Sequence, residues 1–335
     1  MNSRTKALAI GGGVAAAALI GWIVLSNIAT SRAEDALYEV LDEYNIRQNV
    51  HWRDLSASPF GKVEITDLSI NVMGKTVATI DNVEIDDFTN TANKKSISLQ
   101  AKNIANAEGL SPLADTEYLL ASGMSEAPPF SLNAKWDFDL RDDEGKVEIA
   151  FKQPNALEGK VSLELENIKV VSNMRQNLMN AFSSGSMFGS SSLFGTPIWM
   201  LGAQSALEAL GSVGVRKAEA SVKDDGYVER AIALHKRYEI PVTLDEKNPD
   251  KARDKIYEKT IDDQVDACKK AADTRFRNIP KAESSCKAIG KFLHGKSSSL
   301  TLKSQPNRPV TLSTFFETAS NSPDQALLLM APVLD

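Results

Sequence analysis

The chain has 335 residues, of which 42% are hydrophobic and 24% charged, proportions typical of a folded protein. Its formal net charge of −6 argues against nucleic acid as a partner, because phosphate groups require a basic surface. A chain of this length can bury a substantial core, either in one large domain or in two ordinary ones.

An uncharged apolar segment at residues 7–29 follows the basic residues Arg4 and Lys6. As a helix it would be roughly 34 Å long, enough to cross a hydrocarbon core of about 30 Å. Basic residues before the segment and the acidic pair Glu34 and Asp35 after it predict a cytoplasmic N-terminus and an exported main domain. Residues 1–29 are therefore predicted to be a transmembrane anchor.

Two alternatives to this anchor remain open. The tripeptide before Glu34 is similar to a signal-peptide cleavage site. The apolar segment, however, is longer than the apolar region of most signal peptides. A buried helix of a soluble domain is the other alternative, and it fits less well because the segment is apolar on every side.

Cys268 and Cys286 are the only cysteines of the chain. In an exported protein a lone pair at this spacing predicts a disulfide, and two buried thiols are the alternative. The three histidines lie far apart in the sequence, so no metal site is expected.

Residues 30–171 predict a helix followed by an antiparallel sheet. The helix, in 30–48, would continue the anchor and dock on the domain. Strand segments begin at Val50, and the alternation of Val147, Ile149 and Phe151 is typical of a strand with one buried face. Short connections between these segments indicate antiparallel neighbours. The expected fold class is α+β, with a curved, mostly antiparallel sheet and a C-terminal helical layer.

A short pattern recurs in these strands at 65–70, 80–85 and 165–170: apolar, two polar residues, apolar, any residue, apolar. Two apolar residues three positions apart would face opposite sides of a regular strand. A bulge at the Asp or Asn would restore one common face and bend the strand. Ordinary β-sandwich strands with Asp or Asn at their turns are the alternative.

Residues 172–213 differ in composition, and no Asp, Glu, Lys or Arg occurs from 176 to 207. We expect this uncharged apolar segment to be helical and to cover the apolar face of the sheet or to lie on the bilayer. A second membrane span is the alternative, although Pro197 and several Ser and Gly residues interrupt the segment.

Residues 214–335 predict a strand and a helical region containing the disulfide. The segment 215–237 reads as a strand, an Asp-Asp-Gly turn and a helix, with Asp225 or its neighbour as the cap. Helices at 249–273 and 282–294, a strand near 297–306 and a helical stretch from 311 to 330 follow.

The stretches SASPFGKVEITDLSI and ATIDNVEIDDF after a basic-flanked anchor resemble the AsmA-like and YdgA-like proteins of the bacterial envelope. ASVKDDGYVERAIAL and SLTLKSQPNRPVTL are similar to C-terminal parts of such proteins. The resemblance implies an inner-membrane-anchored, β-rich periplasmic domain with a curved apolar groove. Larger proteins of this kind are associated with the movement of lipid between membranes, which implies a lipid-related role.

No catalytic, nucleotide-binding or metal-binding motif is found, so we expect no enzyme and no cofactor. Acidic pairs such as Asp224-Asp225 lack the spacing of a calcium loop. The predicted partners are the inner membrane, lipid and another envelope protein.

The sequence therefore predicts a lipid-handling or envelope-maintenance protein that presents an apolar groove. A non-enzymatic structural or assembly partner of another envelope complex is the alternative. A charge placed at Ile85 or Ile149 is expected to be buried without a partner. The predicted groove and cover residues are Ile65, Leu68, Ile85, Ile149, Phe182, Phe188, Phe194 and Trp199.

Overall fold

The computed structural model describes most of the chain from Tyr38 onward. The described residues are 38, 41–42, 47–58, 62–72, 74–112, 119–120, 123–170, 211–243, 245 and 247–335. Within them no helix is both long enough and apolar enough to cross a membrane. The predicted anchor, and the predicted cover segment up to residue 210, lie outside the described residues.

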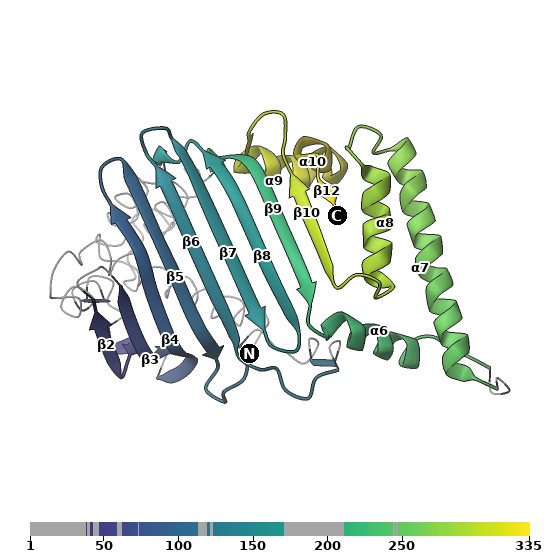
Figure 1. Ribbon diagram of the computed structural model, residues 1–335, viewed down its shortest axis with the longest axis horizontal. Coiled ribbons are helices and arrows are strands. Elements are labelled where there is room, and N and C mark those ends of the chain that lie inside the picture. Colours follow the sequence, from purple (N-terminus) through teal and green to yellow (C-terminus); the bar gives the residue numbers. More distant parts are fainter. Residues whose placement is uncertain are drawn as a thin grey trace, which may run out of the picture.

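A single open sheet dominates the described part of the chain and contains twelve strands, all paired antiparallel (Figure 1). The strands up to the helical region are β1 (Val50–His51), β2 (Asp54–Ala57), β3 (Val63–Val72), β4 (Lys75–Asn90), β5 (Lys94–Ala105), β6 (Phe130–Asp139), β7 (Glu144–Gln153), β8 (Leu157–Glu166) and β9 (Gly214–Asp224). They are followed by β10 (Ser299–Ser304), β11 (Val310–Thr311) and β12 (Val333–Leu334). The path runs β1-β3-β4-β5-β6-β7-β8-β9-β10-β12, with β2 paired to β3 and β11 to β9. The predicted α+β class with an antiparallel sheet is confirmed.

Short Asx-containing turns explain why β6, β7 and β8 follow one another as hairpins. In the β6–β7 turn, the Asp139 carboxylate accepts hydrogen bonds from the backbone N–H groups of Arg141 and Asp142, at 2.8 and 3.2 Å. These bonds hold the pKa of Asp139 below its usual value. Asp143 and Asn155 take positive φ in the two turns, a conformation that Asp and Asn tolerate better than most residues.

Left-handed Asp and Asn residues keep the apolar side chains of several strands on one face. In β3, Asp67 has φ of 50° and lies between Ile65 and Leu68, which are both buried. Asn167, just after β8, has φ of 57° beside the buried Ile168. The predicted bulges are not found at these two positions. Thr66 and Leu68 pair with Asn82 and Ile80 without a register shift, and Asn167 lies beyond the end of β8. The left-handed conformation of Asp67, without an extra residue, accompanies the common face of Ile65 and Leu68.

The third predicted position behaves differently. Neither Asp81 nor Asn82 has positive φ, although Ile80 and Val83 are both buried. Two further left-handed residues, Asp87 and Asn103, occur in β4 and β5, each next to a register shift. Asp87 and Asn103 show that the left-handed conformation also occurs in the shorter pattern of apolar, polar, Asx, apolar, outside the predicted positions. The described strands form one sheet, so the alternative of a β-sandwich is not found among them.

Helices follow β9 and stand beside the last strands of the sheet (Figure 1). They are α6 (Tyr227–Tyr238), α7 (Pro249–Thr274) and α8 (Ala282–Leu293). Asp224, the neighbour of the predicted cap, accepts a hydrogen bond from the N–H of Val228 at 2.8 Å. The predicted disulfide between Cys268 and Cys286 is present and joins α7 to α8.

The C-terminal elements pack against the last strands. The predicted helical stretch after residue 310 is interrupted, as expected, and forms α9 (Leu312–Asn321) and α10 (Pro323–Met330). β12 pairs with β10, and the Ser285 hydroxyl of α8 accepts a hydrogen bond from the N–H of Leu334. The outer edge of β10 is thus occupied by β12 and α8.

Candidate functional site

One face of the sheet is apolar from β2 to β12. The register places one row of facing residues across these strands without a polar side chain. Its members are Ala57, Val63, Ile85, Leu99, Ala134, Ile149, Val161, Ala220, Leu302 and Leu334. A neighbouring row, from Leu55 to Leu300, is also apolar throughout. The sheet therefore offers a continuous apolar surface.

The proximal half of this surface, defined here as the apolar side of β3–β5, is buried. Ile85 is 0% exposed and Leu99 is 2% exposed. Leu41, from the short helical stretch before β1, is fully buried in the same cluster. These buried side chains form the main hydrophobic core of the described residues.

The distal half, defined here as the apolar side of β7–β10, is partly exposed. Ile149 and Val161 are 43% and 41% exposed, and Phe151 and Leu302 are each 37% exposed. The Phe151 ring lies over Gly159 on β8, where a Cβ would overlap the ring atoms. The distal half therefore presents aliphatic and aromatic side chains to its surroundings without an intervening charge.

The connection between β5 and β6 borders the distal half at one end of the strands. Pro128 accepts a hydrogen bond through its carbonyl from Nε2 of the buried Gln153, at the end of β7. Gly123 lies against Leu234 of α6, close enough that an added Cβ would be 3.0 Å from Cδ1. This connection thus extends past β7–β9 as far as α6.

Helix α10 borders the distal half at the opposite end. Ser304 faces Ala218 on the apolar side of the sheet and donates a hydrogen bond to the carbonyl of Met330 at 2.5 Å. Val215 and Val310 are buried at this end. The exposed apolar area is therefore framed by the core on one side, α6 at one end and α10 at the other.

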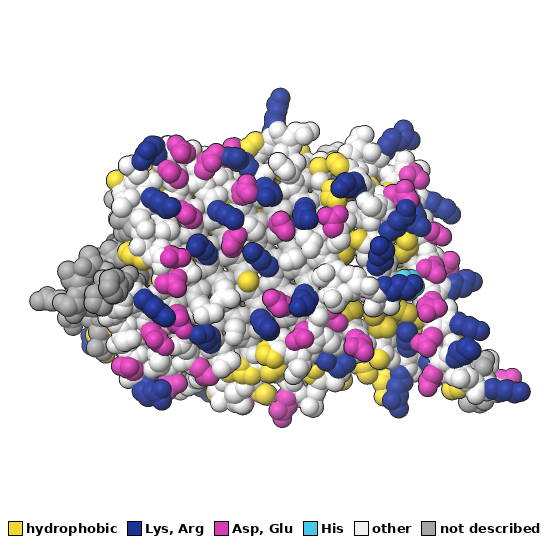
Figure 2. Space-filling model, in the orientation of Figure 1, with side chains coloured by type: hydrophobic (Ala, Val, Ile, Leu, Met, Phe, Trp, Pro, Cys, Tyr) yellow, Lys and Arg dark blue, Asp and Glu magenta, His cyan; other side chains and the backbone are white. Residues whose placement is uncertain are grey.

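The opposite face of the sheet is charged, as Figure 2 shows for the front of the molecule. Lysines and carboxylates of the strands form several ion pairs, among them Lys135 with Asp87, Lys146 with Glu148 and Lys217 with Glu164. Glu84 accepts hydrogen bonds from Lys102 at 2.6 Å and from Lys62 at 2.8 Å. These two bonds lower the pKa of Glu84 to about 2. A face of this kind remains hydrated and does not compete with the apolar face for apolar ligands.

The predicted site residues fall into three groups. Ile65, Leu68 and Ile85 are buried in the core, as expected for the inward side of the sheet. Ile149 shares their face but is 43% exposed. The segment predicted to cover it lies outside the described residues up to residue 210, so the expectation that a charge there would be buried stays a prediction. The remaining predicted residues, Phe182, Phe188, Phe194 and Trp199, lie outside the described residues.

Several exposed residues of the distal half were not among the predicted groove residues, although Phe151 was named as part of an alternating strand. Phe151 and Val161 continue the alternation seen in their own strands, so period two identifies their face. Leu302 lies far along the chain, after the helical region, and only its pairing with Ala220 places it on the same surface. Periodicity identifies the apolar side of a strand but does not report whether that side is covered.

No protein-family model matches the chain, and no curated protein matches it. In the part of the chain described here, no group of three or more His, Cys, Asp or Glu residues could hold a metal ion. The distal half of the apolar face is therefore the candidate site with the clearest chemistry, namely the binding of apolar groups.

Proposed function

We propose that the protein is an envelope protein, anchored in the inner membrane with its main domain in the periplasm, that binds lipid acyl chains on the distal half of its apolar face. The observation that carries this proposal is the exposure of Ile149, Phe151 and Val161 in otherwise apolar rows. Transferring each CH₂ group of an acyl chain from water to such a surface is favourable by about 0.8 kcal/mol. The resemblance to AsmA-like proteins supports the same interpretation.

The shape of the framed area also supports acyl chains as the ligand. The rows extend across four strands, and adjacent strands are about 4.8 Å apart, so the open width is roughly 15 Å. The area lacks charged groups that would hydrogen-bond a polar ligand, whereas the opposite face carries them in abundance. A curved groove, and a cover formed by residues 172–213, remain predictions that refine this proposal.

Site-specific photo-crosslinking in the intact envelope tests the proposal. A photoreactive amino acid replaces Ile149 in one variant and Ala150, the next residue on β7, in the other. Because the two side chains point to opposite faces, we expect a lipid adduct at position 149 and none at 150. Mass spectrometry of the purified full chain identifies the adduct.

The same experiment separates lipid handling from the alternative function. An adduct between position 149 and another envelope protein, without lipid, would support an assembly role and overturn the lipid proposal. Equal lipid labelling at positions 149 and 150 would also contradict it, because such labelling would not depend on the apolar face.

A further inference from the structure

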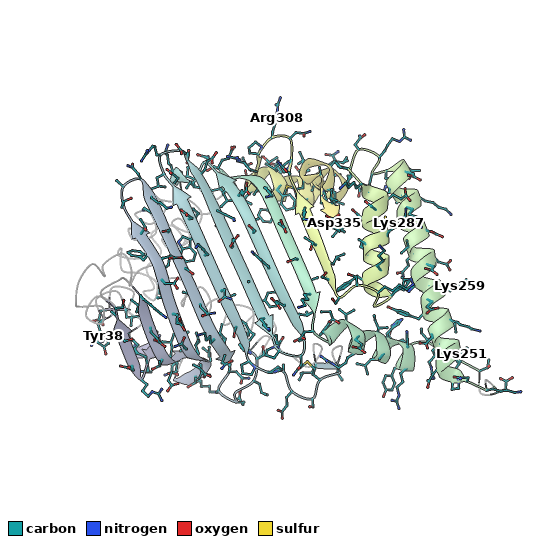
Figure 3. All side chains as sticks on the ribbon, in the orientation of Figure 1. Tyr38, Lys251, Lys259, Lys287, Arg308 and Asp335 are labelled. Carbon is teal, nitrogen blue, oxygen red and sulfur yellow. A yellow bond between two sulfur atoms is a disulfide. The ribbon has the colours of Figure 1, made fainter. Side chains whose placement is uncertain are left out.

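A hollow lies at the β1 edge of the sheet, outside the apolar face described above. It is an open depression with a volume of about 540 Å³. Figure 3 shows Tyr38 at this end of the molecule, opposite the end formed by α7. The residues lining it are Tyr38, Asp42, Arg47, Gln48, Val50, His51 and Trp52.

The hollow combines one negative group, one positive group and two aromatic rings. The Arg47 guanidinium donates a hydrogen bond to the Asp42 carboxylate at 2.7 Å, and it stacks 4.2 Å above the Tyr38 ring. The Tyr38 and Trp52 rings are 5.2 Å apart. The side chains of Arg47 and Asp42 remain 52% and 53% exposed, so both charges are accessible from the hollow.

These groups fit a ligand that itself carries both charges. A phosphate would bind the Arg47 guanidinium, and an ammonium group would bind the Asp42 carboxylate and the aromatic rings. A simple anion would meet the repulsion of Asp42, and a simple cation that of Arg47. We propose that the hollow binds a phosphoethanolamine group. This inference rests on the proposed function, in which the group belongs to a phospholipid.

The hollow lies beside the core of the proximal half. Trp52 packs against the core of the proximal half, and Leu41, which lies between Tyr38 and Asp42 in the sequence, is buried in that core. The hollow therefore adjoins the proximal half, and the strands β3–β6 lie between it and the distal half on β7–β10. The residues that line the hollow follow the predicted anchor in the sequence.

Calorimetric titration of the full chain in a neutral maltoside detergent tests the inference. The probes are dihexanoyl phosphatidylethanolamine, dihexanoyl phosphatidylglycerol and free O-phosphoethanolamine. We expect the wild type to prefer the phosphatidylethanolamine about tenfold, the effect of one charge-assisted hydrogen bond. Asp42→Asn should abolish this preference, and Arg47→Gln should weaken both phospholipids about tenfold.

Arg53→Gln is the matched control, because Arg53 is an exposed arginine of the same segment that pairs with Asp67 and does not line the hollow. Its titrations should equal those of the wild type. Binding of O-phosphoethanolamine as tight as that of the phospholipid would identify the free aminophosphate as the ligand of the hollow. Tighter binding of the phospholipid would identify the lipid.

Two results would overturn the inference. One is the absence of any preference in the wild type, and the other is an Asp42→Asn variant that retains the preference. If lipid crosslinks at position 149 persist in either case, the proposed function stands and only the headgroup site fails. Conversely, a preference that depends on Asp42, together with no lipid adduct at position 149, would retain the headgroup site and remove the acyl-chain surface.

Discussion

Ile85 and Ile149 lie in one row of the sheet, separated by β5 and β6, yet the first is 0% exposed and the second 43% exposed. Their strands share the same alternation of apolar and polar residues. The two halves of the apolar face therefore differ in what lies above them, not in what the strands contain. The proximal half forms the hydrophobic core, whereas the distal half retains partly exposed apolar side chains.

The largest expected effect is a contrast between identical substitutions in the two halves. Ile85→Lys would place a charge in the core without a partner and should destabilise the protein by about 4 kcal/mol or prevent folding. Ile149→Lys should change the free energy of unfolding by less than about 1 kcal/mol, because its ammonium group can reach water. Urea unfolding, followed by circular dichroism, measures both.

A milder pair keeps this comparison measurable if Ile85→Lys does not fold. Ile85→Ala should cost about 3 kcal/mol, and Ile149→Ala about 1 kcal/mol or less. Equal costs at the two positions would show that the distal half is covered in solution. The distinction between the two halves would then be lost.

The disulfide should have the next largest effect, and it should act on the distal half. Cys268 and Cys286 are 18 positions apart, and closing a loop of this size is worth about 3 kcal/mol in the chain-entropy model. In a variant with Cys268→Ser and Cys286→Ser, hydrogen exchange should accelerate in α7, α8 and β10. β3–β5 should exchange as in the wild type, since their core does not depend on the helices. Faster exchange in β3–β5 as well would mean that the two halves unfold as one unit.

The ion pairs of Glu84 should give the smallest effect, and one that depends on pH. The folded-state pKa of about 2 is below the usual 4.5, so the charged carboxylate stabilises the fold above pH 4.5 and progressively less as the pH falls toward 2. Glu84→Gln should therefore cost about 1 kcal/mol at pH 7, as expected for a solvent-accessible ion pair.

Chemical denaturation at several pH values between 7 and 3 tests this prediction. The difference between the wild type and Glu84→Gln should shrink as the pH falls below 4.5. Glu158→Gln, at an exposed position of β8, is the control and should show a smaller effect at every pH. A difference that remains constant with pH would show that the lysines do not stabilise the charged form of Glu84.

Much of the architecture follows from local sequence patterns. Alternation of apolar and polar residues is a property of a few consecutive residues, so the strands and their apolar sides could be predicted from β3 to β9. The cysteine pair, the capped helix after β9 and the break between α9 and α10 also depend on neighbouring residues. Asp67 and Asn167 were identifiable because a break in period two is visible within four residues.

Tertiary structure alone decided which apolar residues are covered. Leu41 helps to bury the proximal half although it precedes β3 in the chain, and Leu302 joins the distal half from beyond the helical region. The hollow likewise depends on contacts between Tyr38, Arg47 and Trp52, which come from three separate local segments. The sequence by itself determined the apolar side of each strand, because side-chain direction is local. Coverage of that side depends on contacts between distant segments, and no pattern within one strand encodes them.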